Sequence, residues 1–123
     1  MQVYKGTLNN VRLIGYLRET PEVYETENGH IATVYIYTQG PYTNEVGEFT
    51  HHYIEWHRVV ARDSHALLLG CYGRANMKFY IEGKIHTRQV ATNDAPTQCI
   101  TEIVADKFEP ILVNATAELS VKK

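Results

Sequence analysis

The segment of residues 53–62, which reads Tyr-Ile-Glu-Trp-His-Arg-Val-Val-Ala-Arg, limits the possible folds more than any other part of the chain. Its aromatic and β-branched residues favour an extended strand, and side chains alternate between the two faces of a strand. The residues that then share one face are Trp56, Arg58, Val60 and Arg62. An indole ring can stack on a base while guanidinium groups hold phosphates, so this face suits a flat, negatively charged partner such as single-stranded nucleic acid.

The composition is typical of one folded, strand-rich domain. The chain has 123 residues, 44% of them hydrophobic, and nine tyrosines, which excludes a disordered chain. Residues 1–6 contain no apolar stretch of signal-peptide length, and no run of residues could span a bilayer. We therefore expect a cytoplasmic protein without a membrane partner. Cys71 and Cys99 form no CxxC motif, so we expect two reduced thiols at packed positions, with a bridge between them as the alternative.

Positive charge is concentrated in the middle of an acidic chain. The net charge is −2, yet residues 56–88 contain six Lys and Arg against two acidic residues. A positive central segment can attract a polyanion despite the overall sign. The alternative interpretation is that these are ordinary surface charges of exposed strands.

The pattern of apolar runs and turn residues predicts strands and one short helix. The expected strands cover residues 8–17, 22–26 joined to 31–38 through Asn28-Gly29, 50–62, 77–88 and 98–108, with a hairpin loop at 39–49 and a polar turn at 89–96. The expected helix is capped by Asp63 or Ser64, ends at Tyr72 and stops at Gly73. Counted as three strands, a helix and two further strands, this order predicts an all-β, five-stranded OB-fold barrel with the helix between strands 3 and 4.

Four blocks in collinear order carry a resemblance to a known family. They are Asn10-Val-Arg-Leu-Ile-Gly15, Glu55-Trp-His-Arg-Val-Val60, Tyr80-Ile-Glu-Gly83 and Thr101-Glu-Ile-Val104, accompanied by Pro21-Glu-Val23 and Asn28-Gly29. From about Leu8 to Phe108 the chain resembles the bacterial single-stranded DNA-binding proteins. The resemblance implies an OB fold over residues 1–108, a homotetramer, and sequence-independent binding that protects unwound DNA in replication, repair and recombination. It also implies association with the nucleoid, and it implies no cofactor and no catalysis.

The resemblance and the strand alternation together predict the binding residues. Trp56 and Tyr42 are expected to stack on bases. The expected cationic residues are Arg58, Arg62, Lys84, His86, Arg88 and Arg12. In the strand 77–88, alternation places Tyr80 and Glu82 on the same face as Lys84, His86 and Arg88. It assigns the other face to the core, with Phe79, Ile81, Gly83 and Ile85. His57 and Tyr80 are expected at contacts between subunits.

The chain also departs from the family pattern. Arg62 stands where the family commonly has a DNA-stacking phenylalanine, and Val90 stands where it often has a tryptophan. Each lost platform removes on the order of 1–3 kcal/mol of stacking, so we expect weaker binding or more dependence on phosphate contacts. Residues 109–123 are expected to be loosely ordered and lack the acidic tip by which the family recruits other proteins.

Other functions receive less support. A metal site is not expected, because neighbouring His51 and His52 point to opposite faces of a strand and His57 lies roughly 20 Å from His51. A nuclease would need clustered carboxylates, and the acidic residues are scattered. The main alternative is an OB-fold protein-interaction module of a primosome or mobile-element system that binds DNA weakly.

Overall fold

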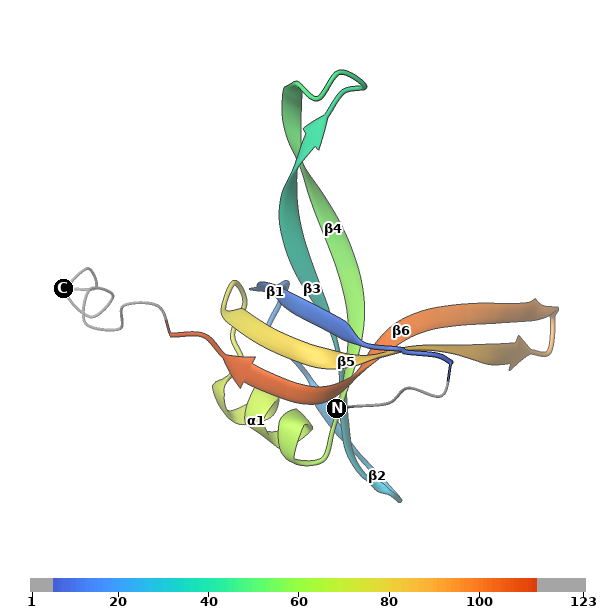
Figure 1. The fold of residues 1–123 in the computed structure, drawn as a ribbon. Coiled ribbons are helices and arrows are strands. Elements are labelled where there is room, and N and C mark those ends of the chain that lie inside the picture. The colour runs from blue at the N-terminus through green and yellow to red at the C-terminus, as the bar shows by residue number, and fades with distance from the viewer. Residues whose placement is uncertain (1–5, 113–123) are drawn as a thin grey trace.

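The computed structural model describes residues 6–112, which form one closed, strongly twisted sheet and a short helix (Figure 1). The strands are β1 (Val11–Leu17), β2 (Val23–Thr26), β3 (Gly29–Thr43), β4 (Phe49–Arg62), β5 (Lys78–Thr92) and β6 (Ala95–Pro110), and the helix is α1 (Ser64–Tyr72). The expected all-β barrel is therefore present.

The sheet closes because β1 pairs with strands on both sides. The strand order is β1-β5-β6-β4-β3-β2, and an additional pairing of β1 with β3 completes the barrel. That closure rests on two residue pairs, Tyr16 with Tyr37 and Leu17 with Ile36. A Cβ atom at Gly15 would lie 2.5 Å from the carbonyl oxygen of Tyr37, so the strands approach this closely only because residue 15 has no side chain.

The inward-facing side chains form one hydrophobic core. Phe79 and Phe108 meet edge to face with ring centroids 4.9 Å apart, and both are almost fully buried. From β4 the core receives Val59 and Ala61, the residues that alternate with the Trp56 face. Burial of each large apolar side chain contributes about 1.5–3 kcal/mol, so this core fixes which face of each strand remains outside.

Two hairpins continue beyond the barrel as arms (Figure 1). The expected loop at 39–49 is mostly strand, because β3 runs to Thr43 and β4 begins at Phe49. The expected turn at 89–96 shrinks to two residues between β5 and β6 for the same reason. Paired backbones satisfy their hydrogen bonds with each other whatever the side chains are, so polar sequences can remain in strands where both faces meet water.

The position of the helix in the strand order was predicted wrongly. α1 follows the fourth strand, because Asn28-Gly29 separates β2 and β3 into two paired strands. Its bounds agree with the prediction, and the Gly73 amide donates to the Leu69 carbonyl at 2.8 Å. The predicted cap is absent, because Asp63 has a φ of 54° and makes no side-chain cap hydrogen bond.

Two further expectations about packing were wrong. Ile85 is 52% exposed, because the pairing of β5 with β1 ends at Gly83 and β5 has left the barrel at residue 85. Cys71 and Cys99 are free thiols at exposed positions, Cys71 near the end of α1 and Cys99 on the β5–β6 arm. β6 continues to Pro110. Most of residues 109–123 lie outside the described residues, so the expectation of a loosely ordered segment stays a prediction.

Candidate nucleic-acid interface

Trp56 lies on the outer face of β4 and is 50% exposed. Its strand register places it opposite Tyr37 of β3, which is itself opposite Tyr16 of β1. The Tyr37 ring meets the indole at 5.2 Å in an edge-on geometry, and the Tyr16 and Tyr37 rings stack at 5.3 Å. Three aromatic side chains therefore form a row across three strands, and we call this the aromatic row.

The sequence reasoning did not include Tyr16 or Tyr37 among the site residues. A signal was available, because Tyr35 and Tyr37 alternate with the buried residues Val34 and Ile36 and so had to face outward. What could not be read from the sequence was the β1–β3 pairing that brings Tyr16 beside Tyr37.

Arg18 is a second residue that the sequence reasoning missed. It follows β1 directly, and its amide donates to the Tyr35 carbonyl at 3.0 Å, which fixes its backbone beside β3. Its guanidinium carbon lies 5.2 Å from the centroid of the Trp56 ring and 5.8 Å from that of Tyr35. Both distances are within the range of a cation–π contact.

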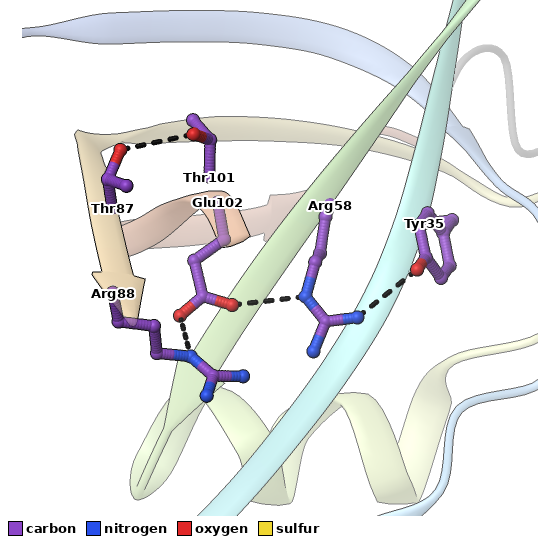
Figure 2. A network of polar contacts seen from close by, with 6 residues as sticks. All are labelled: Tyr35, Arg58, Thr87, Arg88, Thr101 and Glu102. Carbon is purple, nitrogen blue, oxygen red and sulfur yellow. Dashed lines mark hydrogen bonds and ion pairs between the residues drawn. The ribbon is translucent and has the colours of Figure 1, made fainter. Parts of the chain in front are cut away.

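Arg58 and Arg88 are both engaged by one carboxylate (Figure 2). Arg58 Nε donates to Glu102 at 3.1 Å, and Arg88 Nε donates to the other oxygen of Glu102 at 2.9 Å. Arg58 also donates to the Tyr35 hydroxyl at 3.1 Å. Burial alone would raise the pKa of Glu102, but the two arginine hydrogen bonds outweigh it, so the pKa lies below its ordinary value. The cluster retains two positive charges against one negative charge.

The two arms diverge at this cluster and leave a hollow between them. β4 and β6 pair in parallel only at Val59–Ile103 and Val60–Val104, and the part of each strand that precedes these pairs belongs to its own hairpin arm. The hollow measures about 220 Å³ and is lined by Trp56, His57, Arg58, Ile85, Thr101, Glu102 and Ile103. The indole and the arginine–glutamate cluster thus border one concave surface, which we call the fork.

Three of the predicted cationic residues meet in a second hollow. Arg62 from the end of β4 and Lys84 and His86 from β5 line a space of about 390 Å³ together with Asn9, Ile85, Val104 and Asp106. Asn9 holds the N-terminal segment there, because its side chain donates to the Ile85 carbonyl at 2.8 Å and accepts from the Ile85 amide at 2.9 Å. Asp106 offsets part of the positive charge.

Tyr42 and Arg12 lie apart from Trp56. The continuous β3–β4 register from Tyr37 to Tyr42 places Tyr42 on the opposite face of the hairpin from Trp56. Tyr42 is 53% exposed and stacks on His51 with centroids 4.9 Å apart. Arg12 Nε lies 3.4 Å from a carboxylate oxygen of Glu82, so its charge is paired.

The two residues predicted at subunit contacts lie on different strands. His57 is half-buried, and its Nε2 is hydrogen-bonded to Thr38 Oγ1 at 2.9 Å. Burial lowers the pKa of His57 and outweighs the opposing effect of Glu55. Tyr80 lies on β5 opposite Ile14 of β1, and Ile14 is an exposed apolar residue.

Residues 6–112 contain neither a cluster of metal ligands nor a helix that could span a membrane. Within residues 6–112, no group of three or more His, Cys, Asp or Glu side chains could hold a metal ion. In the same part of the chain, α1 does not have the length and apolar character needed to cross a bilayer.

Comparison with known proteins identifies relatives of this barrel. Residues 8–111 match the family model described as the single-strand binding protein family. A single-stranded DNA-binding protein from Bacteroides thetaiotaomicron is 31% identical over 105 residues, which cover 84% of this chain and 65% of that protein.

Two solved structures share the fold. The Plasmodium falciparum single-stranded DNA-binding protein, solved in complex with single-stranded DNA, is 25% identical with a TM-score of 0.76 and matches over 89% of this chain and 99% of that chain. A deletion mutant of the Thermus aquaticus single-stranded DNA-binding protein is 25% identical with a TM-score of 0.74 and matches over 85% of this chain and 50% of that chain.

Proposed function

The chain belongs to the single-strand binding protein family, and on this basis we propose that it binds single-stranded DNA with little sequence preference. The observation that carries the proposal is the half-exposed indole of Trp56, which belongs both to the aromatic row and to the lining of the fork. Every base has a π-face, so stacking on an indole tolerates any sequence. Binding of this kind would keep unwound DNA from re-pairing during replication, repair and recombination.

The charges around Trp56 support a path for the phosphates. Arg58 borders the fork beside the indole, and Arg62, Lys84 and His86 line the second hollow, which shares Ile85 with the fork. Arg88 lies near Arg58, because both arginines pair with Glu102. Because Glu102 offsets one of the two arginine charges, we expect a phosphate to compete with this carboxylate for Arg58 and Arg88.

Tyr42 and Arg12 have smaller expected roles. DNA would reach Tyr42 only by passing around the β3–β4 arm to its other face. Arg12 would have to exchange Glu82 for a phosphate, and such an exposed pair contributes little in either state. Binding requires no cofactor and no chemical step in this proposal.

Removal of the indole tests the proposal. Fluorescence anisotropy of a labelled oligo(dT) should show that Trp56→Ala binds roughly 5- to 150-fold more weakly, which corresponds to the loss of one stacking platform. Leu67→Ala is the matched control, because Leu67 is an exposed apolar residue on α1. Equal affinities of Trp56→Ala and the wild-type protein would refute the proposal.

The protein-interaction module remains a second candidate for one reason. Three of the predicted DNA-contacting arginines, Arg12, Arg58 and Arg88, have carboxylate partners, which reduces the free positive charge. Under that candidate, oligo(dT) would bind weakly at low salt and Trp56→Ala would leave its affinity unchanged.

A further inference from the structure

Arg18 is the side chain near Trp56 whose role the proposed function leaves open. Within residues 6–112, Arg12, Arg58, Arg88 and Lys107 form ion pairs with carboxylates, and Arg18 forms none. Its side chain is exposed, and its charged group lies over the two rings of Tyr35 and Trp56. It is therefore an uncompensated cation above the ring that is proposed to receive a base.

The distance between the two groups decides what can happen when a base arrives. The Arg18 guanidinium carbon lies 5.2 Å from the indole centroid. Stacked planar groups are separated by about 3.5 Å, so a base inserted between them needs about 7 Å. The observed gap is too small, and a base that stacks on this face of the indole must first displace Arg18.

Once displaced from the indole, the Arg18 guanidinium would lie close to the phosphate of the nucleotide that stacks there. The backbone of Arg18 is held to β3 by the hydrogen bond to the Tyr35 carbonyl, so only the side chain can move. A base on the indole carries its sugar and phosphate at the edge of the ring, within reach of an arginine that has just left the ring face. A guanidinium exchanges a cation–π contact for a stronger charge-assisted hydrogen bond to phosphate.

We propose that Arg18 is a DNA-binding residue that covers the Trp56 ring in the free protein and holds a backbone phosphate once a base has replaced it on the indole. Tyr37 acts as the positioning residue, because its ring abuts the indole and its hydroxyl is hydrogen-bonded to Asn76 Oδ1 at 3.4 Å. This inference rests on the proposed function and assigns one more contact of the same site.

The test compares Arg18→Ala with the wild-type protein in two measurements. In the free protein, acrylamide should quench Trp56 fluorescence more strongly in Arg18→Ala, because the guanidinium no longer covers the ring. With oligo(dT), the variant should bind about fivefold more weakly at low salt, and the slope of log K against log salt should fall by about 0.7, the value for one phosphate contact on a single strand. Arg18→Lys should restore most of the slope.

Lys107→Ala is the matched control for the lost charge. Lys107 lies on β6 beside Glu109 and Tyr80, and its neutralisation should leave both the acrylamide quenching and the salt slope close to wild-type values. An unchanged slope in Arg18→Ala, or tighter binding by that variant, would overturn the inference. If the wild-type protein and Trp56→Ala bind oligo(dT) equally, the proposed function fails instead, and the two failures are thereby distinguished.

Discussion

At the scale of single residues, Glu102 determines how much positive charge the fork presents. It is 5% exposed and holds Arg58 and Arg88, residues that are 44 and 14 positions away in the sequence. The strand alternation placed Arg58 and Arg88 on an outer face, but a contact over such separations depends on which strands pair. For this reason the outward position of the two arginines could be predicted from the sequence, and their partial neutralisation by Glu102 could not.

Replacement of Glu102 separates stability from binding. Glu102→Gln should lower the free energy of unfolding by about 1–3 kcal/mol, because both charged hydrogen bonds are weakened. The same variant should bind oligo(dT) more tightly at low salt, since two uncompensated guanidinium groups then face the DNA. Urea unfolding and anisotropy titration check the two effects, and weaker DNA binding by this variant would contradict the account of the fork.

The lowered pKa of Glu102 predicts that the stability of the fold decreases in acid. A carboxylate whose pKa is lower in the folded state than its ordinary 4.5 stabilises the fold above that pH, and the contribution is lost as the pH falls through the folded value. Urea midpoints between pH 6 and pH 3 should therefore fall less steeply for Glu102→Gln than for the wild-type protein. Identical slopes would show that the arginine contacts do not stabilise the ionised form.

The lowered pKa of His57 predicts that the stability of the fold also changes with pH in a higher range than for Glu102. Burial lowers its pKa below the ordinary 6.5, so the neutral ring stabilises the fold above that pH. This contribution is lost as the pH falls from about 6.5 through the lowered pKa. Urea midpoints from pH 8 to pH 5.5 should decline less in His57→Gln than in the wild-type protein. His52→Gln, at an exposed position, should retain the wild-type decline.

At the scale of elements, the barrel was predictable and the arms were not. Alternating apolar residues and the Asn28-Gly29 turn predicted the strands around the core, and the stop at Gly73 predicted the end of α1. The arms escaped prediction because Gln39 to Thr43 and Gln89 to Thr92 have no regular alternation of apolar and polar residues. The backbone pairing that keeps these segments extended does not require such a pattern. Tyr42 was consequently assigned to a loop and not to a face of a strand.

Barrel closure should depend on the absence of a side chain at residue 15. Gly15→Ala should destabilise the protein by about 1–3 kcal/mol or more, because the added Cβ meets the Tyr37 carbonyl and the Ile36 side chain. Gly47→Ala, in the turn of the β3–β4 arm, meets no atom within 4 Å but has a φ of 88°, so it should cost only about 1 kcal/mol of backbone strain. Thermal unfolding monitored by circular dichroism compares the two variants. A smaller loss for Gly15→Ala would contradict the assigned closure.

At the scale of the whole molecule, charge is distributed unevenly over an acidic chain. The net charge of −2 need not prevent binding of a polyanion, because Arg62 and Lys84 line one hollow while Glu19 and Glu22 line a separate hollow next to β2. A phosphate chain should therefore be attracted to the hollow of Arg62 and Lys84. Raised salt should weaken binding more than the net charge alone suggests.

The homotetramer that the family resemblance implies can be tested at the same scale. We expect a homotetramer whose contacts include His57 and Tyr80, and sedimentation should give a mass four times that of the chain. Tyr80→Arg should lower this mass, because it adds a cation beside Arg12 and Lys107 on the face that carries exposed Ile14. Tyr24→Arg on β2 is the control and should leave the mass unchanged. A wild-type monomer would contradict the predicted assembly without affecting the proposed DNA contacts.

The most direct test of the central claim uses the fluorescence of Trp56. The chain contains a single tryptophan, so its emission reports on one ring only. Titration with oligo(dT) at low salt should quench this emission to saturation, and added salt should reverse the quenching as phosphate contacts are lost. Emission that stays constant while anisotropy shows the oligonucleotide to be bound would mean that DNA does not stack on Trp56, and the account of this surface would then be wrong.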